Sequence, residues 1–139
     1  MKFLKLLRDR KAIETVEAAI TLPIALLVML VTINLGLVVF GQQAVQSAAR
    51  HGARMGSVAQ SCPACWAVRE ARGAIEGAGV VHNPDVQILS GGGRAGSVLK
   101  IRVTGEVPNF FGGLGAIFPG LPSGPFQLNG EATFRQEGW

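Results

Sequence analysis

The strongest constraint on this chain is an uncharged run from Ala18 to Ala49, whose central part, from Ile20 to Phe40, is almost entirely apolar. About 20 helical residues, each rising 1.5 Å, cross the roughly 30 Å hydrocarbon core of a bilayer. Across the whole chain only 16% of residues are charged, against about a quarter in an average soluble domain. The sequence therefore predicts a single transmembrane helix, and the remaining residues suffice for one domain.

The basic residues near the N-terminus predict the orientation of this helix. Five of them precede the apolar run: Lys2, Lys5, Arg8, Arg10 and Lys11. The next two, Arg50 and Arg54, follow well after it. The positive-inside rule then places the N-terminus in the cytoplasm and the rest of the chain across the membrane, where disulfides persist. We expect a basic cytoplasmic leader at residues 1–12, a transmembrane helix at 13–41 and an extracytoplasmic head at 42–139.

A cleaved secretory signal peptide is the alternative interpretation of the apolar run. Such a peptide has an apolar region of about 7 to 15 residues followed closely by a small-residue cleavage site. Here the apolar run is longer, and the nearest small-residue sites, around Val45 to Ala49, lie inside a continuing helical pattern. These features favour a retained anchor.

Small residues continue the helical pattern beyond the membrane. Ala48, Gly52 and Gly56 stand four residues apart, so that one helix face is nearly bare of side chains. Such a face allows another helix to approach closely. It is equally typical of a helix that packs on its own domain, and the two interpretations are compatible.

The residues after this helix predict an α+β head. Ser61 to Pro63 interrupts the first helix, and a short second helix follows, ending at Gly77 or Gly79. Alternating apolar and polar residues then predict strands at three places: 85–89, 98–107 and 126–134. A Gly-rich turn at 90–96 would join the first two strands as a hairpin. The simplest packing is a three-stranded antiparallel sheet against the helices.

The connection from Pro108 to Pro125 is unusually apolar for a loop. It contains six large apolar residues: Phe110, Phe111, Leu114, Ile117, Phe118 and Leu121. One interpretation is that the loop folds back over the sheet, because large exposed apolar patches are rare on soluble surfaces. The other is a lobe that faces lipid or binds a partner.

The polar residues give no sign of an active site. Cys62 and Cys65 have the spacing of thiol-disulfide oxidoreductases, but the βαβ framework of those enzymes is missing, so a structural disulfide is favoured. His51 and His82 match no zinc pattern, and no nucleophile motif or clustered basic stripe is present. We expect no catalysis, cofactor, metal, nucleic acid or small-molecule substrate.

Glu14 and Glu17 lie directly before the apolar run. A carboxylate at the edge of the hydrocarbon is costly unless it is paired, which makes Glu17 a candidate for a functional role. Arg10 or Lys11 on the same helix could pair with it. If the leader were removed between Ala12 and Ile13, the new ammonium group of a neighbouring chain could instead neutralise Glu17 in lipid.

The combined pattern resembles the TadE-like family, minor pseudopilins of the tight-adherence (Flp-type) pilus machinery of bacteria. The resemblance is carried by the basic leader, Glu17, the uncharged helix with Pro23, the segment Gln42-Gln43-Ala44-Val45 and the segment from Ala48 to Arg54. It is weaker beyond residue 60, where the elements and the segment from Glu131 to Glu137 still fit the family's outline.

The resemblance implies a pilin-like precursor of the bacterial cytoplasmic membrane, whose leader a prepilin peptidase removes five positions before a glutamate. That rule places the processing site at Ala12 and Ile13 and assigns Glu17 to subunit pairing. The partners implied are other pilin-like subunits and the pilus assembly machinery, and the mature chain would enter the pilus or its base. The sequence departs from the family at Ala12, usually Gly, and at Ala18, usually aromatic. An uncut chain would be a single-pass membrane-tethered assembly, binding or secretion-associated module.

Overall fold

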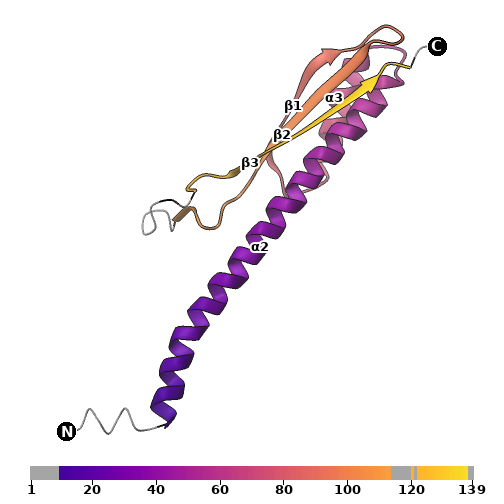
Figure 1. The fold of residues 1–139 in the computed structure, drawn as a ribbon. Coiled ribbons are helices and arrows are strands. Elements are labelled where there is room, and N and C mark those ends of the chain that lie inside the picture. Colours follow the sequence, from indigo (N-terminus) through magenta and orange to yellow (C-terminus); the bar gives the residue numbers. More distant parts are fainter. Residues whose placement is uncertain (1–9, 114–119, 121, 138–139) are drawn as a thin grey trace. The chain divides into compact units, whose positions relative to one another are not determined.

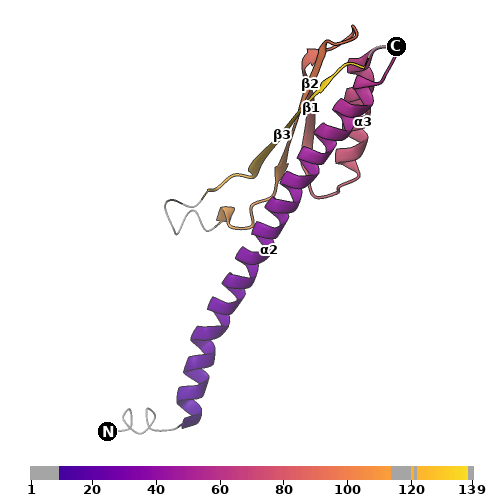
Figure 2. The same ribbon diagram turned by 45° about the vertical axis from the view of Figure 1, so that its right-hand side comes forward.

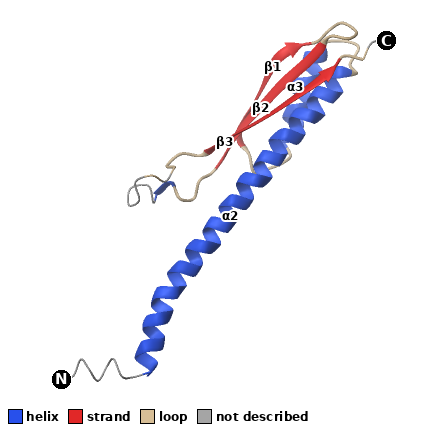
Figure 3. Ribbon diagram, viewed as in Figure 1, coloured by secondary structure: helices blue, strands red, loops and turns tan. Residues whose placement is uncertain are grey.

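The computed structural model describes residues 10–113, 120 and 122–137, with side chains from residue 13 onward. Among these residues, two helices precede three strands: α2 (Arg10–Ser57), α3 (Pro63–Glu76), β1 (His82–Gly91), β2 (Val98–Val107) and β3 (Phe126–Arg135) (Figure 1). Figure 3 shows the helices α2 and α3 in blue and the strands β1, β2 and β3 in red. The predicted α+β class is confirmed. Residues 1–9 of the leader, and residues 114–119 and 121 of the apolar loop, lie outside the described residues.

The chain divides into two compact units, Met1–Leu35 and Gly36–Trp139. In the first unit the described residues form the N-terminal part of α2, and its large apolar side chains, such as Ile20 and Val28, are exposed. Among the described residues α2 alone is long and apolar enough to cross a membrane. Pro23 lies inside it, as transmembrane helices tolerate. This helix fits a membrane-anchored protein.

The second unit, which we call the head, is built on an antiparallel sheet with the order β1-β2-β3. Alternate residues of the central strand β2 are fully buried, including Leu99, Ile101 and Val103. Both α3 and the C-terminal part of α2 lie against the same face of the sheet (Figure 2). The alternation in the sequence therefore separates a face covered by helices from a polar face.

Glycine allows α2 and the sheet to approach each other closely at two contacts. A methyl group at Gly130 of β3 would lie 2.8 Å from the backbone nitrogen of Gln46 and 2.8 Å from the carbonyl oxygen of Val45. A methyl group at Gly41 would lie 2.7 Å from the side chain of Val107. Glycine inside a strand often marks such a close backbone approach. These contacts seat α2 directly on the sheet.

Strand β1 differs most from its predicted bounds, 85–89. It extends from His82 to Gly91 and contains Pro84. Proline is tolerated there because β1 is an edge strand, and its pairing with β2 is irregular between His82 and Asp85. The turn predicted at 90–96 joins β1 to β2, and Gly92, Gly93 and Gly96 all have positive φ, which favours glycine.

Candidate assembly surfaces

The first candidate surface is the apolar face of α2 around Glu17. The Glu17 side chain is exposed, and none of the described side chains forms an ion pair with it. Its backbone carbonyl accepts a hydrogen bond from the Thr21 hydroxyl at 2.7 Å, so that hydroxyl has a partner within the helix. The side chains of Arg10 and Lys11, the alternative partners, lie outside the described ones. Glu17 is thus an exposed carboxylate at the start of an apolar helix.

The predicted processing site lies in the first turns of α2. Ala12 and Ile13 are the third and fourth residues of the helix that starts at Arg10. The Ile13 side chain is 53% exposed, and the Ala12 side chain is not among those described. The bond between these residues therefore belongs to regular helix.

The small-residue stripe of α2 lies within the head. Ala48 is buried, and a methyl group at Gly52 would lie 2.5 Å from the carbonyl oxygen of Ala67 and 2.6 Å from the Cβ of Ala71 on α3. A methyl group at Gly56 would meet both Leu99 of β2 and the carbonyl oxygen of Pro63. The structure places this stripe against the chain's own α3 and sheet, where its close approach builds the head.

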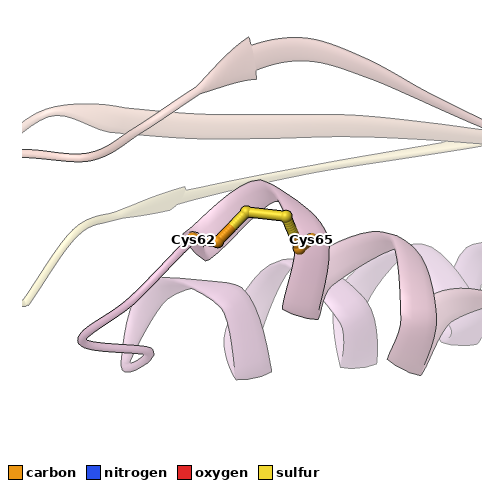
Figure 4. Close-up of a disulfide and its surroundings, with 2 residues drawn as sticks. All are labelled: Cys62 and Cys65. Atoms are coloured by element: carbon orange, nitrogen blue, oxygen red, sulfur yellow. A yellow bond between two sulfur atoms is a disulfide. The ribbon is translucent and has the colours of Figure 1, made fainter.

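Cys62 and Cys65 form a disulfide at the start of α3 (Figure 4). Cys62 precedes the helix with a φ of 44°, and the structure gives α3 no side-chain cap. The backbone N–H groups of Cys65 and Trp66 donate instead to the Cys62 carbonyl. The disulfide thus closes the first turn of a helix that begins without a capping side chain.

Two glutamines join α2 to the edge of the sheet, and the sequence analysis assigned them no structural role. Gln42 donates through its side-chain nitrogen to the Asn129 carbonyl at 2.7 Å, and Gln46 donates likewise to the Glu131 carbonyl at 2.9 Å. Both acceptors lie on the edge strand β3. Exposed strand edges are prone to pairing with other chains, so these glutamines satisfy and protect part of that edge. Their four-residue spacing on the helix was the available signal.

The polar face of the sheet contains a charge cluster that we call the Glu131 cluster, formed by Lys100, Arg102 and Glu131. Lys100 Nζ lies 2.8 Å from Glu131 Oε2, and Arg102 Nε lies 2.7 Å from Glu131 Oε1. Hydrogen bonds from Lys100 and then Arg102 hold the pKa of the Glu131 carboxyl below its ordinary value. Cross-strand pairing places Arg102 directly opposite Glu131. The polar face is thus internally paired on two strands.

His51 and His82 are the two histidines that were considered as metal ligands. His51 lies on α2 with its Nε2 3.8 Å from Glu70 Oε2, and His82 begins β1. Among the described residues no group of three or more His, Cys, Asp or Glu is arranged to hold a metal ion.

The comparisons with known proteins give one match, which covers part of α2. Residues 14–54 match the family model of the TadE-like protein. Searches of curated proteins and of solved structures gave no match. The match contains Glu17, Ala48 and Gly52, whereas Ala12, Ile13, Gly56 and both cysteines lie outside it. The resemblance to the TadE-like family is confirmed over this segment.

Proposed function

We propose that this chain, whose membrane segment matches the TadE-like family model, is a non-catalytic, minor pseudopilin-like component of a tight-adherence (Flp-type) pilus. It would act by packing its helix among other pilin-like helices in the bacterial cytoplasmic membrane. The head would be presented on the extracytoplasmic side.

The observation that carries this proposal is the exposed carboxylate of Glu17 on an exposed apolar helix. A passive anchor needs no acidic group at the edge of the hydrocarbon, and keeping one there is costly. Large side chains such as Val16 and Ile20 on either side of Glu17 are also exposed. The family match begins at residue 14 and includes them.

The proposed mechanism is charge pairing between neighbouring helices. Cutting the chain between Ala12 and Ile13 would remove the basic leader and create an ammonium group at Ile13. That ammonium would lie one helical turn from Glu17 of its own chain and could equally reach Glu17 of an adjacent subunit. Because the interaction takes place at low dielectric, an unpaired carboxylate there would oppose assembly.

Mass spectrometry of the N-terminus of protein isolated from its native membrane tests the processing step. We expect mature protein to start at Ile13. The variant Ala12→Lys should block cutting, and Ala12→Gly, the residue usual in the family, should preserve it. A wild-type chain that starts at Met1 would contradict processing and favour the tethered alternative.

The variant Glu17→Gln tests the pairing step. We expect normal insertion into the membrane, because glutamine is close in size to glutamate, but loss of co-assembly with other pilin-like subunits, measured by crosslinking in the membrane. Glu14→Gln, three residues away on the same helix, is the matched control and should co-assemble. Unchanged co-assembly of Glu17→Gln would contradict the pairing role.

A membrane-tethered binding or secretion-associated module is the second candidate, and two observations favour it. Ala12 departs from the family's usual glycine, and the small-residue stripe of α2 is occupied by α3 and the sheet rather than left open for another helix. Moving the head onto an unrelated anchor separates the candidates. Normal function of that chimera would favour the tethered module, and loss of function would favour helix assembly.

A further inference from the structure

The contacts between α2 and β2 place one end of the sheet beside the end of the apolar run. Leu99, near the start of β2, lies against Gly56, and Val107, at its end, lies against Gly41. The strand therefore runs antiparallel to the part of α2 between Gly41 and Gly56. Phe40 is the last residue of the apolar run, so Val107 lies level with the residue that follows it. All of these residues belong to the head unit.

The connection from β2 to β3 leaves the sheet at this same end. Hydrogen bonds join its two described segments at Asn109, Pro122 and Gly124, which we call the neck. Asn109 donates through its side-chain nitrogen to the carbonyls of Pro122 and Gly124. Its side-chain oxygen accepts a hydrogen bond from the Phe111 backbone N–H at 2.9 Å. These bonds hold the start of the connection, at Asn109, close to its end, at Pro122 and Gly124. Phe110 and Phe111 are therefore held beside the neck.

The residues of this connection suit lipid. Residues 108–125 include no charged side chain, and Phe110 is 52% exposed. The hairpin turn at the other end of the same sheet carries Arg94 and has no large apolar residue between Gly92 and Ser97. An exposed apolar group lowers its free energy on leaving water by about 25 cal/mol per Å². The two ends of the sheet thus differ in the solvent that they favour.

We propose that Phe110 and Phe111 insert into the outer leaflet of the membrane and form a second lipid contact of the head. Phe110 lies three residues beyond Val107, a reach of at most about 10 Å. The headgroup layer on each side of a bilayer is about 5 to 7 Å thick. Val107 contacts Gly41, the residue after the apolar run, so Phe110 is within this reach of the hydrocarbon boundary when the membrane span ends at Phe40.

We assign this contact to lipid because the position of Phe110 and Phe111 and the lack of charge in residues 108–125 both favour it. A typical protein–protein interface has a polar rim and about ten direct hydrogen bonds, whereas residues 108–125 offer Asn109 and Ser123 as polar side chains. The Asn109 side chain is already used within the neck. This proposal requires only that α2 spans the membrane and is independent of pilus assembly.

Tryptophan fluorescence in vesicles with brominated acyl chains tests the insertion. The full chain with Trp66→Phe and Trp139→Phe, carrying Phe110→Trp as its single fluorophore, is reconstituted into phosphatidylcholine vesicles. We expect brominated lipid to quench this tryptophan about twofold or more relative to unbrominated lipid. The control is Ala95→Trp, an exposed position in the opposite turn, which should not be quenched.

A third probe separates the premise from the proposal. Val31→Trp lies within the apolar run and must be quenched if α2 spans the bilayer. Quenching at Val31 with none at Phe110 would overturn the lipid contact, and no quenching at Val31 would overturn it together with the membrane span. The double variant Phe110→Ser/Phe111→Ser should keep the thermal unfolding transition of the head. Loss of that transition would show that these phenylalanines belong to the core instead, which also overturns the proposal.

Discussion

The N-terminal part of α2 and the head both depend on apolar side chains, but they place them in opposite ways. From Ile13 to Leu35 the large apolar residues point outward and are about half exposed, as Ile20 is at 59%. In the head, three of the four residues that α2 contributes to the buried core are alanines: Ala48, Ala49 and Ala53, with Val45 as the fourth. Bulky residues lie along the segment that is long and apolar enough to cross a membrane, and small residues let the helix approach the sheet.

Truncating one isoleucine in each region gives the largest expected difference. Ile101 is fully buried at the centre of β2, and Ile101→Ala should lower the free energy of unfolding of the head by about 2 to 5 kcal/mol, the usual cost of such a cavity. Ile20→Ala removes the same atoms from the exposed face of α2 and should leave the free energy of unfolding of the head unchanged. Urea titration of the full chain in detergent, followed by circular dichroism, measures both. Equal losses would mean that the helix packs on the head in solution.

Adding one methyl group at a helical glycine tests how closely the head is packed. At Gly52 the new methyl would overlap Ala67 and Ala71, so Gly52→Ala should destabilise the head by about 1 to 3 kcal/mol. Gly73 on α3 has nothing within 4 Å of the corresponding position, and Gly73→Ala should stabilise by up to about 1 kcal/mol through helix propensity. The same substitution thus changes sign between two helices, as thermal unfolding can measure. A stabilising Gly52→Ala would mean that α3 does not contact α2 closely.

Periodicity explains why most of the fold was predictable from the sequence. The uncharged run Ile20 to Phe40 and the alternation in β2 each record a solvent preference residue by residue, so the helix and the central strand were predicted correctly. The extra length of β1 was not predicted, because Pro84 and the irregular pairing near it break the alternation. A sequence pattern predicts a helix or strand well where each face of that element has one constant environment. It predicts edge strands such as β1 poorly.

Partners of individual side chains were predictable only where they are close in the sequence. The Cys62–Cys65 pair was expected, whereas the bonds from Gln42 and Gln46 to β3 join residues more than 80 positions apart. Gly130 could have been recognised as a close backbone approach, since glycine within a strand often has that role. The helix that approaches it could not have been named, because that depends on how the whole head packs.

The head contains a disulfide, between Cys62 and Cys65. We expect its contribution to the free energy of unfolding of the head to be moderate. Cys62→Ser opens a loop of only four residues, for which the chain-entropy model gives a loss of about 2 kcal/mol. We expect a lower unfolding midpoint in urea with the fold retained, and Cys65→Ser should give the same loss. The double variant should lose no more than either single variant, because only one bond is removed. Additive losses would show that each sulfur has a separate packing role.

We expect the smallest effect on stability from the Glu131 cluster. Glu131 has two cationic partners, whereas Glu17 has no ion-pair partner among the described side chains. Hydrogen bonds from Lys100 and Arg102 lower the pKa of Glu131 below its ordinary value of 4.5. A carboxyl with a lowered pKa in the folded state stabilises the fold fully above its unfolded pKa. That contribution is lost as the pH falls below 4.5 through the folded value.

The urea midpoint should therefore decrease more between pH 7 and pH 3 for the wild type than for Glu131→Gln, which lacks this titrating group. The difference should be small and should shrink in high salt, because the cluster is exposed to solvent. Glu76→Gln, which removes one negative charge from α3, is the matched control for net charge. If Glu131→Gln keeps the full pH dependence of the wild type, the cluster orients the strands without stabilising them.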